Sequence, residues 1–168
     1  IKKATYADLV IDSDFKYVAI GDGSAAAESY VEKLTEALNA EAKKNGVNDI
    51  EFSNKAYAGN TVSNERANLS DVSDADLVTV GFSNVEFLAK AVNALMEGNE
   101  DLDWAAVVGE ENVQYVDELL AEVAAKIAEA GIAGEPAVMV NNAVEAYAYA
   151  AVLYAVELPA LVNEIKAV

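Results

Sequence analysis

The sequence predicts an α/β protein with a parallel sheet that has helices on both faces. Short segments rich in β-branched residues alternate with longer segments in which apolar residues recur every three or four positions. The short segments are apolar nearly throughout, as strands are when both faces of a parallel sheet are covered. Because crossovers between parallel strands are right-handed, we expect a doubly wound, flavodoxin-like three-layer sandwich.

The expected elements follow from periodicity and from turn residues. The strands are expected at residues 18–20, 50–58, 76–81 and 136–140, and the helices at 25–45, 85–96, 112–130 and 143–166. In the first helix Tyr30, Leu34 and Leu38 recur at four-residue spacing, and Gly46 follows as a stop signal. Ligands of such folds bind beyond the carboxyl ends of the strands, so the segments there are the candidate site.

Size and charge limit the possible partners. The 168 residues are 54% hydrophobic, enough for one domain over residues 1–168 with a substantial core. With 29 acidic and 11 basic residues the net charge is −18, which repels nucleic acid and anionic membranes. The apolar stretch at 143–162 is interrupted by Glu145 and Glu157, so we interpret it as a buried helix and not as a membrane span.

Two residue types are absent from the sequence. Without cysteine, the chain has no disulfide, thiolate metal site or cysteine nucleophile. Without histidine, it lacks the usual general base and a common metal ligand. We therefore expect no metal and no cofactor.

Three segments at the expected strand ends resemble blocks of the SGNH (GDSL-type) ester hydrolases, which contain Gly-Asp-Ser, a glycine and Gly-x-Asn-Asp. They are Gly21-Asp22-Gly23-Ser24, Ala58-Gly59-Asn60 and Gly81-Phe82-Ser83-Asn84. In the third block Ser83 stands where the family often has glycine, and Val85 stands where it prefers aspartate. The resemblance covers about residues 15 to 168 and implies the same α/β fold. It also implies hydrolysis of small-molecule esters or carbohydrate esters by a serine nucleophile.

The resemblance also assigns roles to single residues. Ser24, Gly23 and Asp22 fall in the catalytic block, although the nucleophile position itself falls on Gly23 and Ser24 comes one position late. Gly59 and Asn84 fall on the positions that hold the oxyanion of the transition state. Each residue also has a structural interpretation: Ser24 as a helix N-cap or a residue of the N-terminal turn, Asn84 as a helix N-cap, Asp22 as an Asx-turn residue and Gly59 as a turn glycine.

The last block of that family, Asp-x-x-His, has no counterpart in this sequence. We therefore expect a fragment or a degenerate member that lacks the last strand, and we doubt its catalytic competence. The alternative is a non-catalytic binding or cell-envelope domain with the same fold. A third alternative is a nucleotide-binding domain, since Gly-x-Gly-x-x-Ala follows the first strand, but no acidic residue ends the second strand to bind a ribose.

Other expectations concern partners and location. Four carboxylates, at Glu28, Glu65, Glu86 and Asp103, are available for acid–base chemistry, but their spacing pairs none of them. A missing last strand would leave a sheet edge uncovered, so we expect possible self-association through that edge. The resemblance favours a secreted or cell-surface bacterial protein, with a cytoplasmic one as the alternative.

Overall fold

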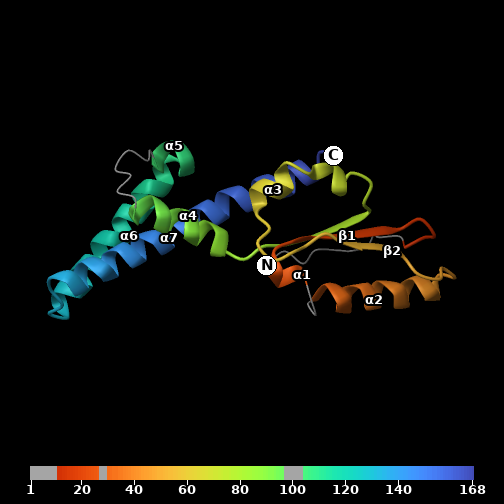
Figure 1. The fold of residues 1–168 in the computed structure, drawn as a ribbon, viewed down its shortest axis with the longest axis horizontal. Coiled ribbons are helices and arrows are strands. Elements are labelled where there is room, and N and C mark those ends of the chain that lie inside the picture. The colour runs from red at the N-terminus through yellow and green to blue at the C-terminus, as the bar shows by residue number, and fades with distance from the viewer. Residues whose placement is uncertain (1–10, 27–29, 97–103) are drawn as a thin grey trace. The chain divides into compact units, whose positions relative to one another are not determined.

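The computed structural model of the chain describes residues 11–26, 30–96 and 104–168 (Figure 1). Their contacts group into two compact units, one formed by residues up to Ser83 together with Leu161–Val168, and one formed by Asn84–Ala160. The sequence predicts a single domain over residues 1–168.

The first unit is a mixed α/β structure. Its elements are β1 (Lys16–Gly21), α1 (Gly23–Ala26), α2 (Tyr30–Lys44), β2 (Glu51–Asn54), α3 (Val62–Arg66), the 3-10 helix η1 (Leu69–Asp71) and β3 (Leu77–Gly81). The strands form one parallel sheet in the order β2-β1-β3. The central strand β1 is buried from Tyr17 onward because it has a neighbour on both sides and helices over its faces.

The core of this unit lies between the sheet and α2. Tyr17 and Ala19 of β1 pack with Val31, Leu38 and Ala42 of α2, all of them buried. These α2 residues share one side of the helix, since they recur at spacings of seven and four. The amphipathic pattern of residues 30–44 therefore places α2 over the sheet, as the sequence predicts.

The other face of the sheet carries α3 and the last residues of the chain. Arg66 of α3 forms an ion pair with Glu164 through its guanidinium group (Nη2 to Oε1 2.5 Å). Beside β3, Val78 and Val80 line a cavity of about 580 Å³ together with Val162 and Ile165. Helices thus lie on both faces of a small three-stranded parallel sheet, and the predicted α/β class is confirmed at that level.

The second unit is helical. It contains α4 (Val85–Met96), α5 (Trp104–Val108), α6 (Glu110–Glu129) and most of α7 (Glu135–Ile165). The ring of Phe87 in α4 meets the ring of Tyr154 in α7 edge-on at 5.8 Å. A groove of about 960 Å³ lies between α6 and α7. Its lining residues are Asn112, Tyr115, Leu119, Val140, Ala143, Val144, Tyr147, Ala148, Ala151, Val152, Ala155 and Val156.

The predicted strand at residues 136–140 is wrong, because these residues form the beginning of α7. Pro136 is the second residue of that helix, where proline is tolerated since the first turn needs no N–H donors. A short apolar run does not distinguish strand from helix, and Val138 and Met139 are 57% and 65% exposed instead of buried in a sheet. Asn141 and Asn142, which stand between the predicted strand and the predicted last helix, also lie inside α7.

The exposure of α7 also differs from the expectation of a buried helix. Only 33% of its most apolar window is buried, and Tyr147 is 60% exposed. By length and composition alone α7 is the one helix of the described residues that could cross a membrane, a property that core helices share. The short helices α3 and α5 were not predicted, because five-residue segments carry too little periodicity.

Candidate functional site

The candidate site lies at the carboxyl end of β1, where the strand order changes direction. The chain proceeds from β1 to β2 on one side of the sheet and then returns to β3 on the other side. At such a switch point the loops that follow the central strands diverge and leave room for a ligand. The loop after β1, which contains Asp22, Gly23 and Ser24, occupies this position.

Asp22 joins the loops that follow β1 and β3. Its Oδ1 accepts the backbone N–H of Ser24 at 2.8 Å, which is the hydrogen bond of an Asx turn. Its Oδ2 accepts both the N–H of Ser83 at 2.7 Å and the Ser83 hydroxyl at 2.5 Å. Burial alone would raise the pKa of Asp22, but the hydrogen bonds from Ser83 and Ser24 outweigh burial and lower the pKa to about 2.

Two glycines let β1 and β3 approach each other closely. Gly21 has φ +152°, and a Cβ added there would lie 2.1 Å from the carbonyl oxygen of Gly81. A Cβ added to Gly81 would lie 2.8 Å from the Cβ of Ala25. Larger residues are therefore excluded, and the close approach lets the N–H of Asp22 donate to the Gly81 carbonyl at 2.9 Å.

Gly23 and Ser24 follow at the exposed end of β1. A Cβ on Gly23 would meet the Cα and Cβ of Ala58 at 3.5 and 3.6 Å, which is ordinary contact, so sterics do not require glycine there. The Ser24 hydroxyl donates a long hydrogen bond of 3.4 Å to the carbonyl of Gly81. Ser24 is the second residue of α1, which agrees with its interpretation as a residue of the N-terminal turn of a helix and not with the N-cap interpretation.

Asn60 fixes the loop after β2. The sequence indicates no role for this residue. Asn60 is only 4% exposed. Its amide nitrogen donates to the carbonyl of Gly21 at 3.0 Å and to the Glu65 carboxylate at 2.5 Å, and its oxygen accepts the N–H of Thr61 at 2.9 Å. The amide nitrogen of this side chain thus connects the second loop to both β1 and α3.

Glu65 is the buried carboxylate behind this loop, with 6% of its surface exposed. Burial raises its pKa, the hydrogen bond from Asn60 opposes that rise, and the nearby charge of Asp71 adds to it. Thr61 caps α3 by accepting the N–H of Asn64 at 3.1 Å, and this cap was the local signal that a helix begins here.

Gly59 precedes Asn60 at the exposed turn, with φ +83°. This left-handed conformation favours glycine, as the turn interpretation predicts. Among the described residues, neither the Gly59 N–H nor the Gly23 N–H donates a hydrogen bond. The structure therefore brings Asp22, Gly23, Ser24 and Gly59 into one unit with two N–H groups available for a ligand.

The remaining candidates lie elsewhere. Asn84 precedes α4 and belongs to the second unit, whereas Gly23 and Gly59 belong to the first. Of the four carboxylates, Glu28 and Asp103 lie outside the described residues. Glu86 forms an ion pair with Lys90 at 2.7 Å, one turn along the same helix.

The chemistry available to Ser24 is limited. A serine hydroxyl attacks an ester only when a base removes its proton, and the sequence contains no histidine. The neighbouring Asp22 carboxylate is a weak base because its pKa is about 2, and its oxygens already accept three hydrogen bonds. Within the described ranges no group of three or more potential metal ligands occurs.

The chain was compared with known proteins by sequence and by structure. No protein-family model, curated protein or solved structure matches it. The resemblance to the SGNH hydrolases therefore rests on the three segments at the strand ends.

Proposed function

We propose that this chain is a non-catalytic, SGNH-like binding domain that holds the carbonyl of a small ester or carbohydrate ester at the end of β1. The proposed fold around the site is the doubly wound sandwich that the sequence predicts. The observation that carries the proposal is the contrast between Gly23 and Asp22. The nucleophile position has no side chain, while the carboxylate next to it still fixes the loops through three hydrogen bonds.

Two features support binding. The loops after β1 and β2 are held by the hydrogen bonds of Asp22 and Asn60, so their backbone is ordered before a ligand arrives. The N–H groups of Gly23 and Gly59 have no acceptor among the described residues and lie in exposed glycines without side chains to obstruct them. Preorganised N–H donors of this kind stabilise a partial negative charge such as that of an ester carbonyl oxygen.

Two features argue against catalysis. The Ser24 hydroxyl is directed at the carbonyl of Gly81, and the nearest carboxylate, Asp22, is too acidic to remove its proton. General base catalysis contributes about 10²- to 10⁴-fold in rate, so a serine without a base is a poor nucleophile. An installed serine at Gly23 would fit sterically, but it would lack a base for the same reason.

An ester hydrolase that uses Ser24 is the second candidate, because Ser24 is exposed at the strand end where the family has its nucleophile. The two candidates are separated by treating the full chain with a fluorophosphonate and locating any adduct by peptide mass spectrometry. The binding domain predicts no adduct on Ser24 and hydrolysis of p-nitrophenyl acetate at the buffer rate. An adduct on Ser24 that is lost in Ser24→Ala would overturn the binding proposal in favour of a hydrolase.

A further inference from the structure

The outer edge of β3 is an unpaired strand edge. In the described part of the chain, β3 pairs only with β1 and has no strand on its other side. The N–H of Asp22 donates to the carbonyl of Gly81, so Gly81 directs its backbone groups at β1. Because this direction alternates along a strand, residues 77 and 79 also face β1, and Val78 and Val80 face the open side.

This edge lacks the features that keep strand edges from pairing. Residues 77–80 are Leu-Val-Thr-Val, with no charge, no proline and three β-branched side chains. All of β3 is partly exposed, in contrast to the buried central strand. The other edge strand, β2, is shorter and begins with Glu51, which pairs with Lys16 at 3.7 Å. The β3 edge is therefore the one suited to accept another strand.

A cavity of about 580 Å³ continues from this edge. Val78 and Val80 line it together with Val162, Ile165 and Val168, and Ser73, Asp76 and Lys166 add polar groups to the lining. An added strand would cover these valine side chains as well as satisfy the backbone groups beside them.

We propose that the occupant of this edge is β3 of a second copy of this chain, paired antiparallel about a two-fold axis at Thr79. In this register Val78 lies opposite Val80 of the second copy, and Val80 lies opposite Val78 of the second copy. Both pairs are hydrogen-bonded pairs, because both residues direct their backbone groups outward. The edge is thus complementary to itself, as a two-fold interface requires.

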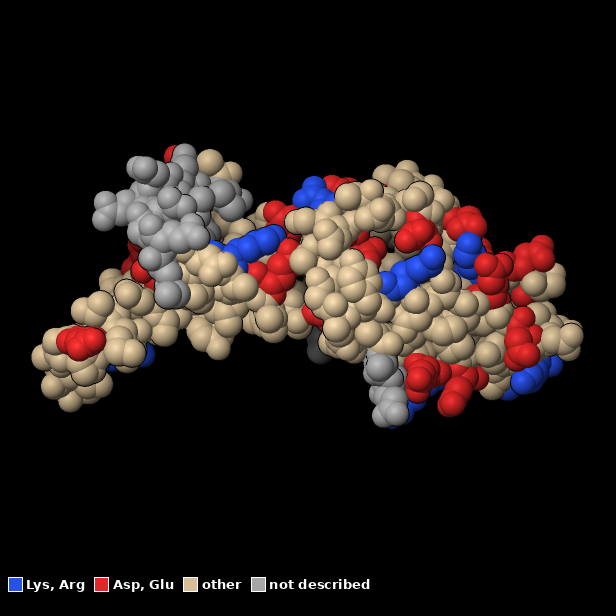
Figure 2. Space-filling view, in the orientation of Figure 1, with Lys and Arg blue, Asp and Glu red and all other residues tan. Residues whose placement is uncertain are grey.

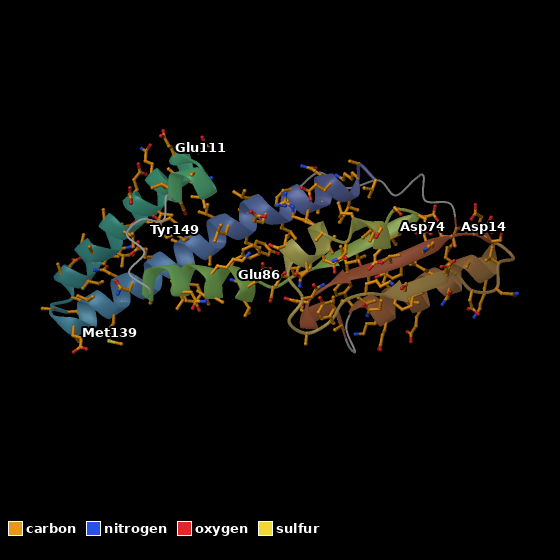
Figure 3. All side chains as sticks on the ribbon, turned by 45° about the horizontal axis from the view of Figure 1, so that its top comes forward. Asp14, Asp74, Glu86, Glu111, Met139 and Tyr149 are labelled. Carbon is orange, nitrogen blue, oxygen red and sulfur yellow. The ribbon has the colours of Figure 1, made fainter. Side chains whose placement is uncertain are left out.

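The charges near the edge are compatible with this register. Asp76, the acidic residue next to β3, lies opposite residue 82 of the second copy, so no two carboxylates face each other across the axis. Asp74, at the same end of the strand, is held by Lys16 at 2.6 Å (Figure 3). The cost of pairing comes instead from the whole molecule, whose net charge is −18 and whose visible face carries more acidic than basic side chains (Figure 2).

This cost predicts a diagnostic salt dependence. Two copies of an acidic chain repel each other over distances that salt screens, with a Debye length of about 10 Å at 0.1 M. Dimerisation measured by sedimentation equilibrium should therefore strengthen about tenfold or more between about 0.05 M and about 0.5 M sodium chloride. A chain that stays monomeric across this range overturns the proposal. So does association that weakens with salt, which would indicate an oppositely charged partner.

The register is tested with two double variants of the same strand. Val78→Glu with Val80→Glu places two glutamates opposite each other twice, and we expect dimer affinity to fall at least about tenfold. Val78→Lys with Val80→Glu places lysine opposite glutamate twice, and we expect affinity to recover. Both variants put two charged side chains at the same positions, so we expect them to be equally stable. Thermal melting followed by circular dichroism checks this, and a difference in dimer affinity then reports on pairing.

A matched control carries the same charge change away from β3. Val138→Glu with Met139→Glu adds two glutamates to α7, where both side chains are exposed. Met139 is labelled in Figure 3. We expect this variant to dimerise like the unaltered chain. The proposal would be overturned if dimer affinity fell equally in this control and in the double-glutamate variant of β3, or if it fell in neither.

A single cysteine gives a direct geometric test, because the natural sequence has none. Residues opposite each other in a non-hydrogen-bonded antiparallel pair have Cα atoms about 4.5 Å apart, within disulfide range. Thr79→Cys should therefore form a covalent dimer on mild oxidation. Ser53→Cys on the opposite edge strand should not. Equal crosslinking of both variants would contradict pairing through β3.

Discussion

The carboxylate of Asp22 accepts both the backbone N–H and the hydroxyl of Ser83, 61 residues further along the chain. This relationship couples the end of β1 to the end of β3. It makes Asp22 a structural residue of the site, whatever ligand the site binds.

Asp22→Asn should destabilise the first unit. An amide presents one oxygen and one NH2 group, so it cannot accept all three hydrogen bonds that the carboxylate accepts. We expect the free energy of unfolding in urea at about pH 7 to fall by about 2 kcal/mol. Asp49→Asn, which alters an exposed ion pair of 3.5 Å with Lys43, should change it by less than about 1 kcal/mol.

The contribution of Asp22 should also depend on pH. Its pKa in the folded chain, about 2, lies below the unfolded value of 3.8, so its stabilisation is fully present above about pH 4. The stabilisation is lost as the pH falls from about 4 through 2. The difference in free energy of unfolding between the unaltered chain and Asp22→Asn should therefore become smaller in acid. A difference that is constant from neutral pH to about pH 2 would contradict this assignment.

Gly21 and Gly23 should respond differently to the same substitution. A Cβ at Gly21 would lie 2.1 Å from the Gly81 carbonyl oxygen, whereas a Cβ at Gly23 has contacts no closer than 3.5 Å. We expect Gly21→Ala to cost about 3 kcal/mol or more, or to prevent folding, and Gly23→Ala to change stability by less than about 1 kcal/mol. Thermal melting of the two variants side by side makes the comparison. Similar losses in both would show that β1 and β3 do not approach each other as described.

Glu65→Gln should raise stability at neutral pH. Burial raises the pKa of Glu65, so the folded chain favours the protonated form. The free energy of unfolding of the unaltered chain therefore falls as the pH rises from 4.5, the pKa of Glu65 in the unfolded chain, through the higher pKa of Glu65 in the folded chain. Glutamine stays neutral and can still accept the hydrogen bond from Asn60, so the variant should be the more stable one at about pH 7 and lose this advantage near pH 4.

The control for this variant is Glu129→Gln, at an exposed position near the end of α6. Because this side chain is exposed, the substitution should change the free energy of unfolding by less than about 0.5 kcal/mol. If Glu65→Gln is the less stable protein at neutral pH, the Glu65 charge contributes favourably and the pH argument is wrong.

The sequence predicts the first unit better than the second. The apolar strands near 18–20 and 76–81 and the helix after residue 30 are confirmed, because their patterns are long or are bounded by clear turn residues. The strand at 136–140 was wrong because an apolar run of five residues fits either conformation when tertiary contacts are unknown.

The candidate site was predictable only in part. Asp22, Gly23, Ser24 and Gly59 stand in turns whose composition marks them, and the structure collects them in one unit. Asn60 and Glu65 were missed as a pair, because their burial and their mutual hydrogen bond arise only once the second loop folds against β1. No local pattern in a sequence reports such a contact.

Amide NMR tests whether the site binds a carbonyl ligand without a nucleophile. An isotopically labelled chain is titrated with an acetylated monosaccharide while its glycine N–H signals are followed. We expect saturable shifts at Gly23 and Gly59, with a dissociation constant on the order of 1 mM, and no shift at the turn glycine Gly46. Unchanged Gly23 and Gly59 signals, or shifts shared equally by Gly46, would contradict the binding proposal.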